Sequence, residues 1–128
     1  MLNFSNIMIG THQPKVLGEF YEKVFDKRPD MHEETWYGWT VGNTFFSLGE
    51  HSEVKGKAKE PQRIILNFET KEVQKEFERI QKIAGITIIK EPYEMSGSAS
   101  GGQGAWIATF ADPDGNYFQL MTPWEGDK

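Results

Sequence analysis

The first residues of the chain alternate between apolar and polar, and the spacing then becomes helical. Residues 3–10, "NFSNIMIG", are rich in apolar and β-branched residues, which is typical of a strand. After Pro14, a favoured first residue of a helix, Val16, Phe20 and Val24 recur on one helical face. The sequence therefore predicts a strand followed by an amphipathic helix.

Two aromatic runs come next. "ETWYGWTVG" and "NTFFSLGEH" both have strand composition, and the Gly42-Asn43 pair between them suits the tight turn of a hairpin. Residues 52–62, "SEVKGKAKEPQ", are charged and contain Pro61 near their end, which predicts a solvated connection.

The order of elements then starts again. Residues 63–69, "RIILNFE", predict a strand. Thr70 is expected to cap a helix that has Val73 and Phe77 on its apolar face and ends at Gly85. A further strand, "ITIIKEP", is expected to end at Pro92.

A Gly/Ser loop and a hairpin complete the chain. The loop, residues 95–104, is either a lid that orders over a ligand or a plain disordered loop. In the hairpin that follows, "ATFADPDGNYFQLMTPW", Asp112 and Asp114 are interpreted as turn formers rather than catalytic acids, because Gly115 permits a positive φ.

The two halves also match residue by residue. Aligning Asn6 with Arg63 pairs Ile7 with Ile64 and Phe20 with Phe77. We therefore predict an α+β fold built by duplication within a single domain, residues 1–128. Module one spans about 3–51, the connection about 52–62 and module two about 63–124.

Composition and charge limit which partners and which cellular compartment are expected. The length of 128 residues suits one domain, and a net charge of -5 without a dense Lys/Arg run argues against nucleic acid. The absence of cysteine removes disulfides and thiolate chemistry. With no signal-peptide pattern and no apolar run of about 20 residues, we expect a cytoplasmic protein without a membrane partner.

Three segments carry a resemblance to a known family: "KVLGEFYEKVF", "KEVQKEFERIQKIAGITIIKEP" and "FADPDGNYFQLMTP". Through them the chain resembles the vicinal oxygen chelate superfamily, which includes glyoxalase I, bleomycin-resistance proteins and extradiol dioxygenases. The resemblance implies two tandem βαβββ modules forming a curled mixed sheet around a cleft, with the helices outside, and a homodimer.

The resemblance also implies four strand positions for metal ligands. Here they fall on Asn6, Arg63, Gln119 and either Ser47 or Phe46, depending on the strand register. Arg63 has no lone pair to donate and repels cations, while Asn and Gln carbonyls are weak ligands. We therefore expect no metal and no other cofactor.

The three histidines lie outside these positions. His12 and His32 are interpreted as solvated surface residues. His51 follows Glu50 at the end of a strand, where the pair is a weak candidate for acid-base catalysis or an off-pattern metal site. The alternative is that both residues are ordinary surface groups.

Strand alternation predicts which side chains line a small-molecule site. The candidates are Asn6, Met8, Arg63, Tyr117, Gln119 and Met121, joined by tryptophans as stacking surfaces, above all Trp39 and Trp106 and also Trp36 and Trp124. Arg63 suits an anion, which Asn6 and Gln119 would orient. Alternatively, Arg63 makes a structural ion pair and Gln119 hydrogen-bonds across the barrel.

These residues favour a protein that binds a small, partly aromatic or anionic molecule in its cleft without the usual metal. The alternative is a metal-dependent lyase, isomerase or dioxygenase related to glyoxalase I, with an off-pattern site. One fold hosts both kinds of chemistry, so the resemblance does not choose between them.

Overall fold

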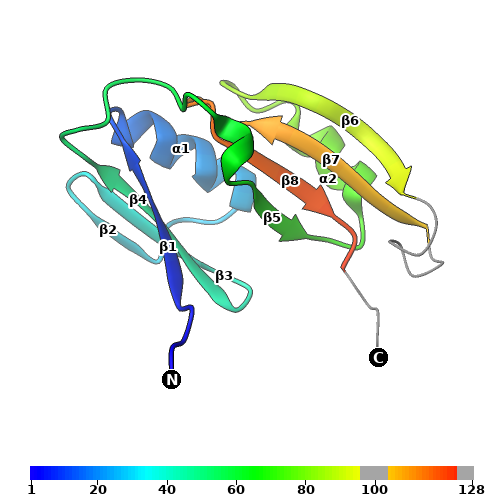
Figure 1. The fold of residues 1–128 in the computed structure, drawn as a ribbon, viewed down its shortest axis with the longest axis horizontal. Coiled ribbons are helices and arrows are strands. Elements are labelled where there is room, and N and C mark those ends of the chain that lie inside the picture. Colours follow the sequence, from blue (N-terminus) through cyan, green and yellow to red (C-terminus); the bar gives the residue numbers. More distant parts are fainter. Residues whose placement is uncertain (96–103, 124–128) are drawn as a thin grey trace. The chain divides into compact units, whose positions relative to one another are not determined.

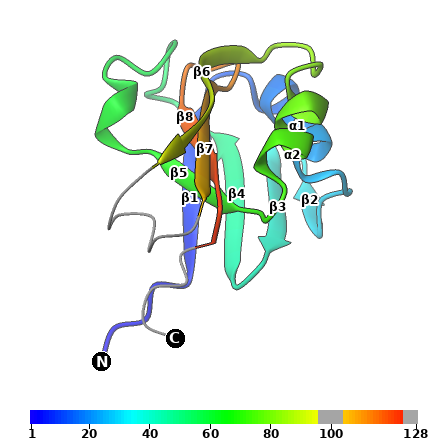
Figure 2. The same ribbon diagram turned by 90° about the vertical axis from the view of Figure 1, so that its right-hand side faces the viewer.

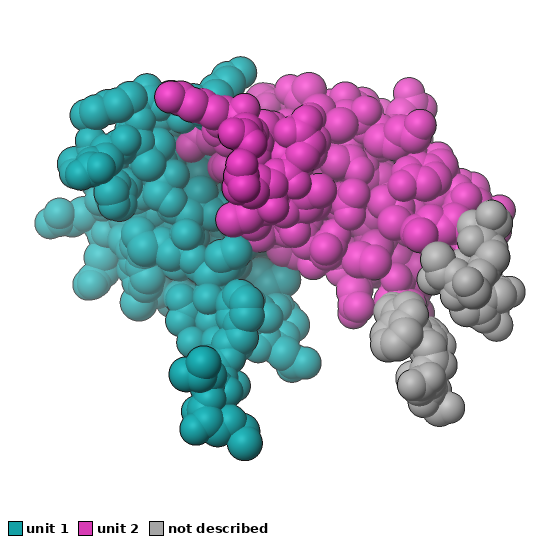
Figure 3. Space-filling model, in the orientation of Figure 1, with its two compact units in different colours: residues 1–57 teal, residues 58–128 magenta. Residues whose placement is uncertain are grey.

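The computed structural model describes residues 1–95 and 104–123, and it divides into two compact units, Met1–Lys57 and Ala58–Lys128 (Figure 3). In both units the elements follow the order βαβββ. The predicted α+β class and the predicted duplication are therefore confirmed. The Gly/Ser loop, for which the sequence left a lid and a plain loop as alternatives, falls mostly on residues 96–103, which lie outside the described residues.

Unit 1 is one four-stranded sheet with a helix on one face (Figures 1 and 2). Its strands lie in the order β1-β4-β3-β2, with β1 parallel to β4 and the other pairs antiparallel. Its elements are β1 (Asn6–Thr11), α1 (Pro14–Phe25), β2 (Met31–Glu33), β3 (Trp36–Val41) and β4 (Thr44–Glu50). The predicted strand, helix and hairpin are confirmed, while β2 was missed because three exposed residues carry no readable periodicity.

Helix α1 packs an unusual residue against the sheet. Gly18 lowers helix stability by about 1 kcal/mol relative to Ala, so its position needs an explanation. A Cβ atom at Gly18 would lie 2.8 Å from the ring of Tyr37 on β3, closer than real contacts allow. The missing side chain thus lets the Tyr37 ring pack directly on the helix.

The face of this sheet toward α1 forms an aromatic core. The ring of Phe46 lies 4.7 Å from that of Tyr21 and 5.1 Å from that of Phe25, between ring centroids. Because neighbouring strand residues point to opposite faces, Ser47 lies on the face away from the helix. This decides the register that the sequence left open between Phe46 and Ser47.

Unit 2 repeats the design with its own four-stranded sheet, ordered β5-β8-β7-β6 with β5 parallel to β8 (Figure 1). Its elements are the 3-10 helix η1 (Pro61–Arg63), β5 (Leu66–Glu69), α2 (Val73–Ile80), β6 (Thr87–Met95), β7 (Ala105–Ala111) and β8 (Tyr117–Met121). Phe77 of α2 stacks on Phe110 of β7 at 5.1 Å between centroids, so α2 covers one face of the sheet.

The start of the second module differs from the prediction. The strand begins at Leu66 rather than at residue 63, and Arg63 ends the short helix η1. Pro61 favours this turn, in which the Arg63 backbone N–H donates to the Glu60 carbonyl at 3.0 Å. As a result Ile64 lies outside the strand and is 68% exposed, although it was expected within the strand of residues 63–69.

Two further boundaries were wrong. Helix α2 ends at Ile80 instead of Gly85, and Thr70 does not cap it, since its hydroxyl accepts from the Glu72 N–H at 3.0 Å, outside the helix. Strand β6 runs through Pro92 to Met95. It tolerates proline because it is an edge strand, and a register shift interrupts its pairing with β7 there.

The turn between β7 and β8 has the structural role that its sequence predicts. The Asp112 carboxylate is buried and accepts from the backbone N–H groups of Asp114 at 2.8 Å and Asn116 at 3.0 Å. Gly115 has a φ of 83°, which suits glycine. The aspartates therefore build the turn.

Neither helix in residues 1–95 and 104–123 has the length and the apolar character that crossing a bilayer requires.

Candidate functional site

The sheet of unit 2 carries a row of polar side chains on the face away from α2. Gln119 of β8 is in register with Asn67 of β5 on one side and Thr109 of β7 on the other. The Gln119 side-chain amide donates to the Thr109 hydroxyl at 3.1 Å. We call Asn67, Gln119 and Thr109 the polar row. Gln119 thus bonds to the neighbouring strand, while Asn67 is exposed.

The predicted alternation of β8 is confirmed. Phe118 and Leu120 are buried on the α2 side, at 0% and 4% exposed. Tyr117 and Met121 share the opposite face with Gln119 and are half-buried. These three side chains therefore lie together, as the sequence indicated.

The equivalent face of unit 1 is apolar. Met8 of β1, Ser47 of β4 and Gly38 of β3 are in register with one another, as the members of the polar row are. The Ser47 hydroxyl is turned back onto the Ile7 carbonyl, to which it donates at 3.1 Å. The positions of unit 1 that match the polar row therefore carry no carboxamide side chain.

Aromatic rings cover the glycines on this face. A Cβ at Gly38 would lie 2.4 Å from the Phe45 ring, and one at Gly49 would lie 2.7 Å from the Trp36 ring. The two rings are 6.2 Å apart between centroids, and Met8 reaches the same spot over Gly49. We call Met8, Trp36 and Phe45 the aromatic platform.

Asn6 lies on the platform side of β1 by alternation, and it is exposed. Its side-chain amide donates to the Ser5 hydroxyl at 2.8 Å. Asn6 is in register with Phe45 rather than with Ser47, so it stands one strand repeat away from Met8 and Ser47.

The two tryptophans that the sequence singled out lie elsewhere. Trp39 is fully buried under α1, and its indole N–H donates to the Lys27 carbonyl at 3.0 Å. Trp106 shares the α2 side of its strand with Phe110. Trp36, which the sequence also offered as a stacking surface, lies on the aromatic platform. The glycines inside the neighbouring strands mark this place, because such glycines often lie beneath an aromatic ring. Trp124 lies outside the described residues.

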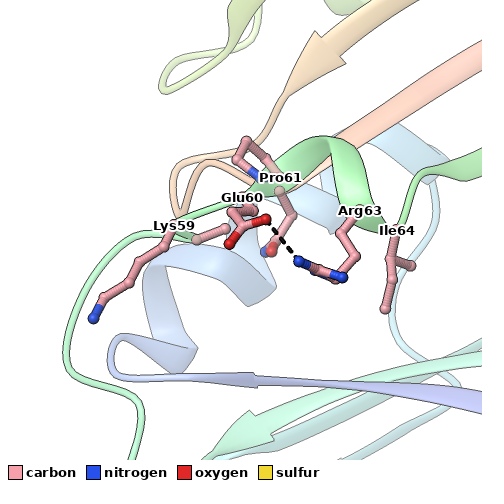
Figure 4. A pocket seen from close by; sticks show the side chains of 7 residues that line it. Lys59, Glu60, Pro61, Arg63 and Ile64 are labelled. Atoms are coloured by element: carbon pink, nitrogen blue, oxygen red, sulfur yellow. Dashed lines mark hydrogen bonds and ion pairs between the residues drawn. The ribbon is translucent and has the colours of Figure 1, made fainter.

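Arg63 stands apart from both faces. Its guanidinium pairs with the Glu60 carboxylate at 2.7 Å, and the two side chains are 71% and 70% exposed (Figure 4). The structural ion pair, one of the two alternatives, is what the structure contains.

The residues present do not suit a divalent ion. Arg63 is outside the sheet, and the strand neighbour of Gln119 is Asn67, a second weak carboxamide donor. Within the two described ranges, no three His, Asp or Glu side chains are grouped so that they could hold a metal.

The histidines have local roles. The ring Nδ1 of His51 accepts from the Glu53 N–H at 3.1 Å, and Glu50, the last residue of β4, is exposed. The pair of Glu50 and His51 stays a candidate that rests on the sequence. His32 stacks on Tyr37 at 4.1 Å between centroids, and His12 is exposed.

The pKa values of two side chains in unit 1, Asp30 and Tyr37, are shifted by their surroundings. The Thr40 N–H and then the Lys27 ammonium lower the pKa of the Asp30 carboxyl. Burial raises the pKa of the Tyr37 hydroxyl, and the nearby carboxylate Glu19 adds to this. Both contacts serve the packing of unit 1.

Solved structures with known folds resemble this chain along nearly its whole length. A glyoxalase/bleomycin resistance protein/dioxygenase family enzyme from Burkholderia phytofirmans PsJN is 25% identical, with a TM-score of 0.71 over 94% of this chain and 98% of that one. A glyoxalase/bleomycin resistance protein from Albidiferax ferrireducens T118 is 20% identical, with a TM-score of 0.74 over 94% and 98%. A glyoxalase-related enzyme from Fulvimarina pelagi is 15% identical, with a TM-score of 0.74 over 96% and 89%.

No protein-family model matches the chain, and no curated protein matches it. The structural likeness alone shows that the chain has the fold of the glyoxalase/bleomycin resistance/dioxygenase proteins. The resemblance read from the sequence is thereby confirmed for the fold.

Proposed function

We propose that this protein binds a small, partly aromatic or anionic molecule on the face of the unit 2 sheet that points away from α2, without the metal of metal-dependent relatives. The polar row of unit 2 carries the proposal. Two carboxamides and a hydroxyl stand side by side on it, and none of them is a strong ligand for a divalent ion.

The polar row suits a ligand that both donates and accepts hydrogen bonds. Each carboxamide offers two donors and one acceptor oxygen. The bond from Gln119 to Thr109 joins two neutral groups and has a net value of about 0.5–1.5 kcal/mol. A ligand carbonyl, amide or carboxylate that bonds to Gln119 therefore replaces it at little cost.

Taken by itself, the aromatic platform of unit 1 is a second surface that suits a planar molecule. Met8 is 52% exposed, and Trp36 and Phe45 are both partly exposed on their sheet. Planar molecules stack favourably on such rings. The rings lie over glycines, so no neighbouring side chain on those strands lifts them away from the sheet.

A binding screen tests the proposal. Aromatic carboxylates and amides are added to the purified protein and followed by thermal shift and then by calorimetry. Gln119→Ala is expected to weaken any hit by about tenfold, because the loss of an orienting hydrogen bond to a charged ligand is worth about 1.5 kcal/mol or more. Gln81→Ala, on the exposed end of α2, is the matched control and should leave affinity unchanged.

Metal analysis of the purified protein tests whether the site works without a metal. After exposure to zinc, nickel, manganese and iron salts and gel filtration, we expect less than stoichiometric metal. A stoichiometric ion that is lost in Gln119→Ala contradicts the proposal and favours a lyase, isomerase or dioxygenase with an off-pattern site.

The family resemblance also supports a homodimer, and the lack of cysteine supports a cytoplasmic location; both are part of this proposal. Light scattering after gel filtration tests the first. A mass near that of one 14.7 kDa chain across a wide concentration range contradicts a dimer.

A further inference from the structure

A pocket lies beside η1, away from the polar row and within unit 2 (Figure 4). Its volume is about 360 Å³. Its lining comes from the segment before β5 and from the end of the β7–β8 turn: Ala58, Lys59, Glu60, Pro61, Arg63, Ile64 and Asn116. We propose that this pocket is a second binding site, which takes a small molecule with one carboxylate or phosphate group and a short apolar tail.

The backbone around the pocket is anchored at two points. The Ala58 N–H donates to the Asp114 carbonyl at 2.9 Å, which ties the segment to the β7–β8 turn. On the other side, the Asn116 amide nitrogen donates to the Asp112 carboxylate at 3.0 Å, which fixes the Asn116 side chain. A pocket framed in this way needs little ordering when a ligand enters.

The charged lining side chains favour an anion at Arg63. Lys59, Arg63 and Glu60 are the charged residues of the lining, and Lys59 adds positive charge nearby rather than a contact. In Figure 4 the Arg63 guanidinium reaches toward Glu60, with which it pairs at 2.7 Å, while Lys59 extends outward. Exposed ion pairs of this kind contribute only about 0–1 kcal/mol. A carboxylate or phosphate that pairs with the guanidinium through two oxygens therefore competes successfully with Glu60.

The walls favour an apolar tail. Pro61 is half-buried, and Ile64, next to Arg63, is 68% exposed, so its side chain is a large apolar surface beside the cation. A volume of about 360 Å³ lies at the lower end of the range for small-molecule sites, roughly 300–1,000 Å³. The combination selects an anion that carries a few carbon atoms over a bare inorganic anion.

NMR titration of the full chain tests the site. The probes are butyrate, butyl phosphate, inorganic phosphate and butanol, added to ¹⁵N-labelled protein. We expect saturable shifts of the Ala58, Arg63 and Asn116 amides with butyrate or butyl phosphate, weaker binding of inorganic phosphate and no effect of butanol. Whichever butyl anion binds tighter identifies the head group as carboxylate or phosphate.

Three variants separate the site from general charge attraction. Arg63→Ala should weaken binding about tenfold, and Arg63→Lys should weaken it less, because lysine keeps the charge but lacks the paired donors. Arg28→Ala removes an exposed arginine of unit 1 and should change nothing.

Glu60→Gln gives the most specific readout. It removes the internal competitor of the ligand, so the same anions should bind several-fold more tightly at low salt. Equal affinities in Arg63→Ala and the unchanged protein, a Glu60→Gln variant without tighter binding, or shifts confined to the polar row each overturn the proposal. Because the polar row is untouched by these changes, its own test stands or fails separately.

Discussion

The two units share an order of elements and a strand register, yet they carry different chemistry at matching positions. In unit 1 the row consists of Met8, Ser47 and Gly38, and the Phe45 ring lies over Gly38. In unit 2 the row consists of Asn67, Gln119 and Thr109, and Gln119 donates a hydrogen bond across to Thr109. The faces toward the helices are apolar in both units. Topology therefore constrains the face that packs on a helix and leaves the other face free for function.

The largest loss of stability is expected for a substitution on the face of β4 that packs against α1. Phe46→Ala removes a ring that is 2% exposed and packs between Tyr21 and Phe25, so the free energy of unfolding should fall by about 3–5 kcal/mol. Urea denaturation followed by tryptophan fluorescence measures this loss.

Phe45→Ala is the matched control, since the neighbouring ring lies on the platform and is only partly buried. It should lower the free energy of unfolding by roughly 1 kcal/mol, because most of its surface is not removed from water. Equal losses in the two variants would mean that the faces of β4 are assigned incorrectly.

An intermediate effect is expected at the hairpin turns, which also differ between the units. Asp112→Ala leaves buried backbone N–H groups of Asp114 and Asn116 without their acceptor and should cost about 2–3 kcal/mol. Asn43→Ala, in the exposed turn of the unit 1 hairpin, should stay within about 0.5 kcal/mol. Thermal unfolding of both variants measures the difference. If Asn43→Ala is destabilised and Asp112→Ala is not, the prediction is wrong.

The smallest effect concerns Asp30, an aspartate of unit 1 that is exposed, whereas Asp112 of unit 2 is buried. Its carboxylate accepts from the Thr40 N–H at 2.7 Å, and its folded pKa is lowered. A lowered folded pKa stabilises the protein above the unfolded pKa, and this stabilisation is lost as the pH falls toward the folded value. Asp30→Asn should therefore reduce stability slightly at neutral pH and much less at about pH 3. Chemical denaturation at the two pH values checks the slope, and a loss that is larger in acid contradicts it.

Local patterns predicted a large part of the fold. The apolar spacing along α1, the aromatic runs of β3 and β4 and the Asp-rich turn before β8 were each visible within about ten residues of chain. The predicted ends of strands and helices were less accurate where pairing with another strand decides where an element stops. Pro92 did not end β6, because an edge strand with a register shift has no need of its N–H group.

The candidate site was predicted in part. Gln119, Tyr117 and Met121 share a face because alternation along one strand is a local property. Asn67 was missed, and Trp39 was misplaced, because each depends on which residue of another strand lies beside it.

By itself, then, the sequence determined the α+β class, the duplication and the turn that joins β7 to β8. Those features arise from periodicity and turn chemistry between residues that are close along the chain. Only the tertiary structure decided that Asn67 rather than Arg63 is the strand neighbour of Gln119, and that Arg63 lines a separate pocket. The reason is that strand register and the bond from Ala58 to Asp114 join residues about fifty positions apart, and no local pattern carries that information.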